Sequence, residues 1–436
     1  MKTQRSSLTE KKMETSSDEL LQKVEDIMTS GIDPIKHFKW IDYPRRAGTE
    51  GDRKVADYIF TTLQEYGFQP KTHEFHFLEV SPRFTLIPPL LFICWGLLSL
   101  INILYLENNL IISVVILSVL AIALLALLKL NIFVKFFLDR KAKQMQILEE
   151  KIKHQRLNDK EEKQVMRSKN IIAEVGTDEA EKYILFTAHI DTISSKFSMR
   201  IMKNLVILSI ISFGAYSGAY LLNVIGDFFF HWNFMKELFP LFLILLILVS
   251  ASLGILFMSQ SMRSNESHGI IDDGTGIVIL LELAKFLKDQ NIQNYKFIFG
   301  FFSAEESGLI GSSYYYRKTQ FDKNKLHVIS FDMIGEKPPL AYIKGVNPII
   351  KTPMNPMFNL NINEVAKKLN IEIKGSNFIY PGSDFAHWLF NGYKTNWFIN
   401  SSKVVHSKQD NLNNVNEKLV NNALRLIIGY IIEYLS

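Results

Sequence analysis

The sequence predicts an α/β fold: a mainly parallel sheet sandwiched by helices, with two inserted transmembrane helical hairpins that give four spans. Short apolar runs, typical of buried parallel strands, alternate with segments of helical spacing. Four longer runs have the length of membrane spans. The expected strands are His73–Leu78, Asn170–Val175, Tyr183–Ala188, Lys296–Phe302, Leu326–Phe331 and Thr395–Asn400, and the expected helices are Val55–Tyr66, Ile277–Lys288, Leu360–Leu369 and Asn416–Tyr434.

Composition narrows the class of protein. The 436 residues are 47 % hydrophobic and carry a formal net charge of +5. A mean hydropathy of only +0.07 excludes a bundle of membrane helices from end to end. No arm or face is densely basic, so nothing points to nucleic acid. Cys94 is the only cysteine, which rules out a disulfide within the chain.

Four uncharged apolar runs are long enough to cross a bilayer, which takes about 20 residues as a helix. They are Phe84–Leu106, Asn108–Leu128, Asn204–Gly226 and Leu238–Met262. A buried helix of a soluble core is the alternative for each run. The runs form two hairpins, joined by Leu106–Asn109 and Asp227–Glu237, and each hairpin returns the chain to the side it left. Between the hairpins, Arg140–Lys169 is charged throughout, and we expect a solvated helix at the membrane surface, with a partner-binding helix as the alternative.

Polar residues follow the predicted strands, at the sheet edge where α/β proteins bind ligands. His189 and Asp191 lie in FTAHIDT, where a His and a nearby carboxylate could serve zinc or simply be structural. Asp272 and Asp273 lie in GIIDDGTG, where an ordinary helix N-cap is the alternative. Three further stretches, FFSAEES, SFDMIG and VVHSKQD, add Glu305, Glu306, Asp332, His406 and Asp410.

Taken together, these stretches supply two histidines and three carboxylates suited to metal binding. Two metal ions about 3.5–4 Å apart need a terminal His each, a terminal carboxylate each and one bridging carboxylate. Glu305 is left over, beside Glu306, and can act as a general base.

The order HID, DDGTG, SAEESGLIGS, DMIG and a late His resembles the co-catalytic zinc exopeptidases, which include bacterial leucyl aminopeptidases, plasma glutamate carboxypeptidase and peptidase-like glutaminyl cyclases. PRRAGTEGDRKVADYI and PGSDFAHW add to the resemblance. It covers Pro44–Phe77 and Asn170–Tyr434 apart from the second hairpin. Together with the expected hairpins, this extent divides the chain into a polar N-terminal segment (1–43), a peptidase domain (44–83 and 170–436), the first hairpin (84–128), a charged juxtamembrane helix (129–169) and the second hairpin (204–262).

The resemblance also implies roles for individual residues. One zinc ion would be held by His189, Asp272 and Asp332, and a second by Asp272, Glu306 and His406. Asp191 would orient His189, Glu305 would be the general base, and the Asp272–Asp273 peptide bond would be cis. Substrate contacts are expected from Tyr380, Ser383 and Asp384. Phe385 departs from the family, many members of which have a His there. About 80 residues separate His189 from Asp272, where the family usually has a short loop.

The resulting hypothesis is a membrane-anchored zinc aminopeptidase, a hydrolase acting on peptides. The alternatives are a glutaminyl cyclase-like enzyme with one zinc ion and a catalytically silent receptor of the same fold. Most Lys and Arg residues that flank the spans lie outside the hairpin loops, and the N-terminus has no apolar signal core. We therefore expect the catalytic domain on the cytoplasmic side of the plasma membrane. The natural peptide and the oligomeric state stay open.

Overall fold

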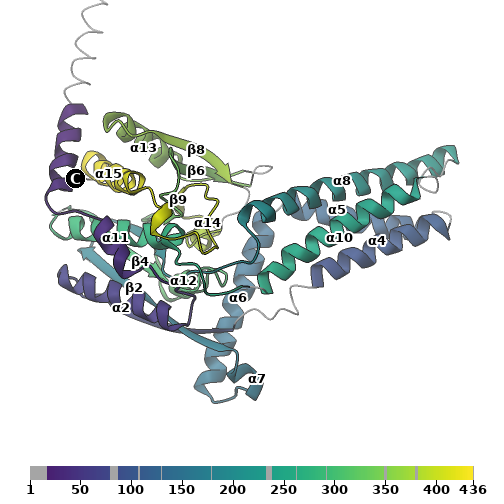
Figure 1. Ribbon diagram of the computed structural model, residues 1–436, viewed down its shortest axis with the longest axis horizontal. Coiled ribbons are helices and arrows are strands. Elements are labelled where there is room, and N and C mark those ends of the chain that lie inside the picture. Colours follow the sequence, from purple (N-terminus) through teal and green to yellow (C-terminus); the bar gives the residue numbers. More distant parts are fainter. Residues whose placement is uncertain are drawn as a thin grey trace, which may run out of the picture. The chain divides into compact units, whose positions relative to one another are not determined.

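The computed structural model describes residues 17–78, 87–106, 109–128, 130–177, 179–231, 238–261, 263–290, 292–347, 351–378 and 382–435. The chain divides into two compact units. We call them the sheet unit, formed by Met1–Glu79, Val134–Ser194 and Asn265–Ser436, and the helical unit, formed by Val80–Phe133 and Ser195–Ser264. Figure 1 shows the labelled elements of both.

The described residues of the sheet unit form a nine-stranded sheet. Its strands are β1 (Lys71–Leu78), β2 (Val165–Gly176), β3 (Lys182–His189), β4 (Tyr295–Phe302), β5 (Leu326–Asp332), β6 (Leu340–Val346), β7 (Thr352–Pro353), β8 (Ile373–Phe378) and β9 (Lys394–Ile399). They lie in the order β1-β2-β4-β3-β5-β9-β6-β7, and β8 pairs with β6. The four central strands β4, β3, β5 and β9 are parallel.

The expectation of a mainly parallel sheet holds only for this centre, because the flanking strands pair differently. β1 pairs antiparallel with β2, and β2 pairs antiparallel with β4. β6 pairs antiparallel with β7 and β9. The β1–β2 pair places Leu78 opposite Val165. The chain between them is thus inserted into what would otherwise be a hairpin connection.

Helices cover both faces of the sheet (Figure 1). They include α2 (Glu50–Glu65), α11 (Thr275–Lys288), α12 (Ile310–Lys318), α13 (Pro356–Lys368), α14 (Ala386–Phe390) and α15 (Glu417–Tyr434). Further helices near this unit are α6 (Leu130–Lys153) and the single turn α7 (Asp159–Glu162). Strand β3 shows the two faces, since alternate side chains point to opposite sides. Ile184 and Phe186 belong to one core with α2, α11, α13 and α15. Leu185 belongs to a second core with α12 and α14. The expected sandwich is confirmed.

One expectation about the inserted segments was wrong. The helix expected over Arg140–Lys169 ends earlier: α6 stops at Lys153, α7 is one turn, and β2 begins at Val165. Pairing with β1 overrides the charged sequence, and the polar side chains find partners there, as the Arg167–Glu74 ion pair shows. The polar segment 1–43 also contributes to the core, because a helix over 17–29 buries Leu20 and Val24.

The helical unit consists of α4 (Ile87–Leu104), α5 (Leu110–Leu128), α8 (Met199–Phe230) and α10 (Phe239–Ser261). α8 and α10 pack along each other. Among the described residues, one stretch, Ile201–Phe230, has on its own the length and composition of a membrane span. The other apolar stretches are shorter, at Leu90–Asn102, Leu110–Ile122 and Pro240–Leu256. Of the four spans expected from the sequence, the described residues thus support one, by length and composition alone.

A buried carboxylate ties the N-terminal segment to α11, the helix that begins at the candidate site. Glu282 Oε1 lies 2.8 Å from His37 Nε2 and from Lys36 Nζ, and it accepts a hydrogen bond from Tyr66 at 2.7 Å. The backbone N–H of Asp33 donates to Oε2 at 2.8 Å. Burial acts to raise the pKa of Glu282, but these hydrogen bonds lower it to about 2.

We therefore expect Glu282→Gln to lower the free energy of unfolding by about 2 kcal/mol, the size of a charged hydrogen bond. Because the folded-state pKa is lowered, this stabilisation is present above the ordinary carboxyl pKa of 4.5 and is lost as the pH falls from there toward 2. Thermal unfolding at pH 7, 4 and 3 should show the difference from wild type shrinking. The control is Glu65→Gln, at an exposed position on α2. A difference that does not depend on pH would contradict the assignment.

Candidate metal centre

The predicted site residues converge at the carboxyl end of the central parallel strands. His189 ends β3 and Asp332 ends β5. Glu305 and Glu306 follow β4, and His406 follows β9. Asp272 comes from the turn Ile270–Gly274, which leads into α11. Parallel strands place their carboxyl ends at one sheet edge, so residues far apart in sequence meet there.

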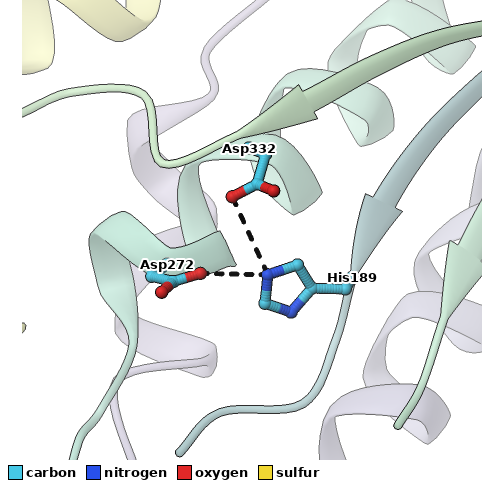
Figure 2. A group of neighbouring side chains, drawn as sticks. All are labelled: His189, Asp272 and Asp332. Atoms are coloured by element: carbon cyan, nitrogen blue, oxygen red, sulfur yellow. Dashed lines mark hydrogen bonds and ion pairs between the residues drawn. The ribbon is translucent and has the colours of Figure 1, made fainter. Parts of the chain in front are cut away.

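Figure 2 shows the first group of possible metal ligands, His189, Asp272 and Asp332. The Nε2 atom of His189 lies 3.0 Å from Asp272 Oδ1 and 4.0 Å from Asp332 Oδ1. One ligand atom from each residue lies within 4.8 Å of the others. All three side chains are buried.

The second group, Asp272, Glu306 and His406, shares Asp272 with the first. The Nε2 atom of His406 lies 3.0 Å from Asp272 Oδ2 and 2.7 Å from Glu306 Oε1. The two oxygens of Asp272 therefore face different histidines, Oδ1 toward His189 and Oδ2 toward His406. A carboxylate in this position can bridge two cations.

Two side chains, those of Asp273 and Asp410, hold the backbone around Asp272. The Asp272–Asp273 peptide bond is cis, as the resemblance implies. Asp273 accepts hydrogen bonds from the backbone N–H of His189 at 3.2 Å and of Gly276 at 2.9 Å. Asp410 accepts from the N–H of Ile271 at 2.6 Å and of Asp272 at 3.3 Å. Both carboxylates thus fix the main chain that presents the candidate ligands.

Asp191 acts on this site differently from the expectation. The Nδ1 atom of His189 bonds the backbone carbonyl of Asp191 at 2.9 Å, whereas the Asp191 carboxylate lies 3.8 Å away. That carboxylate instead accepts from the backbone N–H of Glu305 at 2.9 Å and of Glu306 at 3.2 Å. The main chain of Asp191 therefore orients His189, and its side chain positions the two glutamates.

Sequence reasoning missed Arg45, which is completely buried beneath the site. Its guanidinium donates to the carbonyls of Ile190 at 2.9 Å and Gly269 at 2.9 Å, and also to those of Ile41 and His268. These bonds join the segment after His189 to the segment before Asp272. The only signal was the stretch PRRAGTEG, which was part of the resemblance but had no assigned role.

The site holds an excess of buried negative charge. Burial, together with neighbouring carboxylates, raises the pKa of Asp191 to about 8 and of Asp332 to about 7. The same causes raise the pKa of Glu305. Burial acts to lower the pKa of His189, but the hydrogen bond to Asp272 and the charge of Glu305 raise it well above 6.5. Without further positive charge, burial and mutual repulsion favour the protonated form of these carboxyl groups.

The donor set fits a divalent cation. Asp332 Oδ1 is buried and has no hydrogen-bond partner among the described residues. Imidazole nitrogen and carboxylate oxygen are the ligands of catalytic zinc sites. A cation bound by each of the two groups would supply the positive charge that the buried carboxylates lack.

The remaining predicted residues line the same region, with one exception. Glu305 is 8 % exposed and belongs to neither ligand group. Ser383 and Asp384 are buried, and the Ser383 hydroxyl lies 3.1 Å from that of Ser330. Phe385 is buried with its ring 5.1 Å from the Trp397 ring, so it serves the core. Tyr380 lies outside the described residues.

A separate cavity of about 320 Å³ shares no residue with this site. It lies at the opposite, amino-terminal edge of the parallel strands, where its lining includes Lys182, His327 and Lys394.

Residues 252–431 match the profile of peptidase family M28. This stretch contains Asp272, Glu305, Glu306, Asp332 and His406, and begins after His189 and Asp191.

Two curated yeast proteins are similar over parts of their length. Aminopeptidase Y of Saccharomyces cerevisiae is 42 % identical over 79 residues, which are 18 % of this chain and 14 % of the relative. A probable aminopeptidase of the same yeast is 28 % identical over 180 residues, which are 38 % of this chain and 47 % of the relative. The chain thus covers less than half of the length of these relatives.

Among solved structures, a zinc aminopeptidase from Bacillus subtilis superposes with a TM-score of 0.51 at 12 % identity, covering 93 % of this chain and 96 % of the other. At that identity the likeness concerns the fold alone. The chain is thus similar to peptidase family M28 over residues 252–431, and its fold is similar to that of this zinc aminopeptidase.

Proposed function

We propose that this chain is a membrane-anchored zinc aminopeptidase, which removes the first residue of peptides. The observation that carries the proposal is the position of Asp272, whose two carboxylate oxygens lie 3.0 Å from His189 and 3.0 Å from His406. Few structural arrangements would place so many buried carboxylates around two imidazoles without a cation.

In this proposal the two ligand groups hold two zinc ions. His189, Asp272 and Asp332 form one site, and Asp272, Glu306 and His406 form the other. The metal ions would supply Lewis-acid polarisation of the scissile carbonyl and a water that is acidic near neutral pH. Asp191 and Asp273 keep the ligands in place through the backbone hydrogen bonds described above.

Glu305 is proposed as the general base. Glu305 directly precedes the candidate ligand Glu306 and interacts electrostatically with His189 and Asp332, but it belongs to neither ligand group, so its carboxylate is free to accept a proton. It would accept a proton from the attacking water and pass it to the amine that leaves. The backbone N–H of Glu305, bonded to Asp191, fixes the start of its side chain.

The restriction to the first residue rests on the relatives, two of which are named aminopeptidases. Ser383, Asp384 and Tyr380 are the proposed substrate contacts. Burial raises the pKa of Asp384 to about 6, and the charge of His189 acts to lower it. Asp384 therefore interacts electrostatically with the candidate metal ligands. A buried acidic group near a metal pair is suited to the positively charged end of a peptide.

The membrane proposal rests on the helical unit, in which buried polar groups bond one another between helices and many large apolar side chains are exposed. Asn102 Nδ2 donates to Ser113 at 2.9 Å and Tyr220 at 3.2 Å, and Ser99 bonds Tyr216. Large apolar side chains are exposed, such as Leu91, Ile111 and Ile210, with exposed fractions of 65 %, 75 % and 64 %. In a membrane such a surface contacts lipid. We propose that α4, α5, α8 and α10 are four spans, with the sheet unit on the cytoplasmic side.

We expect Glu305→Gln to retain bound zinc and to lose turnover by about 10²–10⁴-fold, because the amide has the same shape but cannot accept the proton. Aminoacyl reporter substrates measure turnover, and metal analysis of the same sample measures zinc. Glu372→Gln, at an exposed position, is the control for handling and folding. Full turnover in the Glu305 variant would remove this residue from the mechanism.

The bridging role of Asp272 predicts a difference between two ligand variants. Asp272→Ala should lose both metal ions, because it removes a ligand from each, whereas Asp332→Ala should weaken one site only. Metal content after dialysis is the measurement. Two zinc ions retained by Asp272→Ala would show that the bridging assignment is wrong. One zinc ion in the wild-type chain would favour a cyclase-like enzyme, and none would favour a silent receptor.

The topology predicts which positions an impermeant thiol reagent reaches. With Cys94 replaced by Ala, single cysteines can be placed at Asn109, His231 and Lys163, all of which are exposed. In intact cells the first two should be labelled, because they lie in the hairpin loops, and the third should be spared until the cells are opened. Labelling of Lys163→Cys in sealed cells would place the catalytic domain outside.

A further inference from the structure

One face of α6 is docked on the sheet unit, although the sequence pattern suggested a solvated helix. Leu138, Lys141, Met145 and Leu148 recur at intervals of three and four residues, which places them on one side of a helix. Leu138, Met145 and Leu148 are all buried. The residues between them, such as Lys143, are exposed. Within the sheet unit, α6 is thus a packed element.

This face contacts the turn that carries Glu305. The turn is closed by hydrogen bonds from the N–H groups of Gly308 and Leu309 to the carbonyl of Glu305, each 2.7 Å long. The Nζ atom of Lys141 donates to the carbonyl of Ser307 at 2.7 Å. The ammonium group therefore binds a backbone oxygen two residues from the proposed base.

Gly308 makes this close approach possible. Its φ angle of +103° is one that residues with a side chain rarely adopt. A Cβ atom added there would lie only 1.7 Å from Lys141 Nζ. The turn and the lysine are consequently fitted to each other, and the lysine occupies the space that the absent side chain leaves.

Two further contacts fix the position of α6 on either side of Lys141. Met145 packs in a small core with Ala304, which directly precedes Glu305, and with Ile310. On the N-terminal side of Lys141 along α6, Lys135 Nζ donates to Asn391 Oδ1 at 2.9 Å. The lysine is therefore held by a helix that is anchored at both ends of the contact.

We propose that Lys141 is a positioning residue for Glu305, and that α6 is the support of the catalytic turn. The proposal rests on the proposed function of the same site. Asp191 holds the start of the turn through the N–H groups of Glu305 and Glu306, and Lys141 holds its far side through the carbonyl of Ser307. Because α6 lies in the segment inserted between β1 and β2, the insertion takes part in catalysis through this lysine.

Removal of the ammonium group leaves the Ser307 carbonyl without this donor, and the turn should then sample more conformations. Glu305 keeps its bond to Asp191, so its displacement should be partial. We expect Lys141→Met to lower kcat by about 10- to 100-fold, as displacements near 1 Å do, with KM and zinc content close to wild type. Methionine keeps the aliphatic length of lysine, which preserves the packing of α6.

The experiment compares Lys141→Met, Lys141→Arg and the matched control Lys143→Met in the purified full chain. Arginine can reach the same carbonyl, so it should restore most of kcat, and the control should equal wild type. Hydrogen exchange of the peptide covering 303–310, measured without substrate, should be faster in Lys141→Met only. This second readout does not depend on peptidase activity, so it tests the support of the turn even if the wild-type chain cleaves no aminoacyl reporter.

The proposal is overturned if Lys141→Met matches Lys143→Met in both kcat and hydrogen exchange. It is also overturned if kcat falls only in proportion to lost zinc or lost folded protein, because Lys141 would then be a structural residue. An inactive wild-type chain with faster exchange in Lys141→Met would refute the proposed function and leave the positioning of the turn supported.

Discussion

Burial of several carboxylates at one sheet edge is the constraint on which the rest of the sheet unit depends. Asp191, Asp272, Asp273, Asp332 and Glu305 are all buried there. Like charges in a region of low dielectric constant are costly unless hydrogen bonds or cations compensate them. The fold offsets this cost with two histidines, with backbone N–H groups and with the positive charge of the buried Arg45. The negative charges of Asp410, Asp273 and Asp191 act to raise the pKa of Arg45, so these groups attract one another.

The supporting residues outnumber the candidate ligands and act mainly on the backbone. Arg45 donates to four carbonyl oxygens, while Asp191, Asp273 and Asp410 accept from pairs of N–H groups. Hydrogen bonds that fix the main chain also fix the direction in which its side chains leave it. A few buried charged groups can therefore position all of the candidate ligands.

The two insertions leave the sheet at different places. One opens between Leu78 and Val165, which are paired neighbours on β1 and β2. The other opens after Ser194 and closes at Asn265, both close in sequence to candidate ligands. The Oγ atom of Ser194 accepts hydrogen bonds from the N–H groups of Glu266 at 2.8 Å and Ser267 at 2.6 Å, which closes the base of this second insertion. Within the sheet unit, the residues that border each insertion are thus held together by local contacts.

Much of this could be predicted from the sequence, because periodicity and strand-end chemistry are local properties. The apolar runs of β3, β4, β5 and β9 and the helical spacing of α2, α11 and α15 were enough for the α/β class. His189, Asp272, Glu306, Asp332 and His406 could be found because each stands near a predicted strand or turn. Strands β6 and β8 were missed. β8 is short, polar and little buried, and β6, although apolar, is recognisable as a strand only from its pairing with β8 and β9.

What the tertiary structure alone decided concerns pairs of residues that are far apart in the chain. No pattern in the sequence shows that Arg45 lies under His189, that the carboxylate of Asp191 serves Glu305, or that Lys141 reaches Ser307 across 166 residues. Such contacts depend on backbone carbonyls and N–H groups, which every residue has and which no sequence motif marks. The sequence by itself determined the class of fold and the chemistry of the ligands, and the packing of distant segments decided which groups hold them in place.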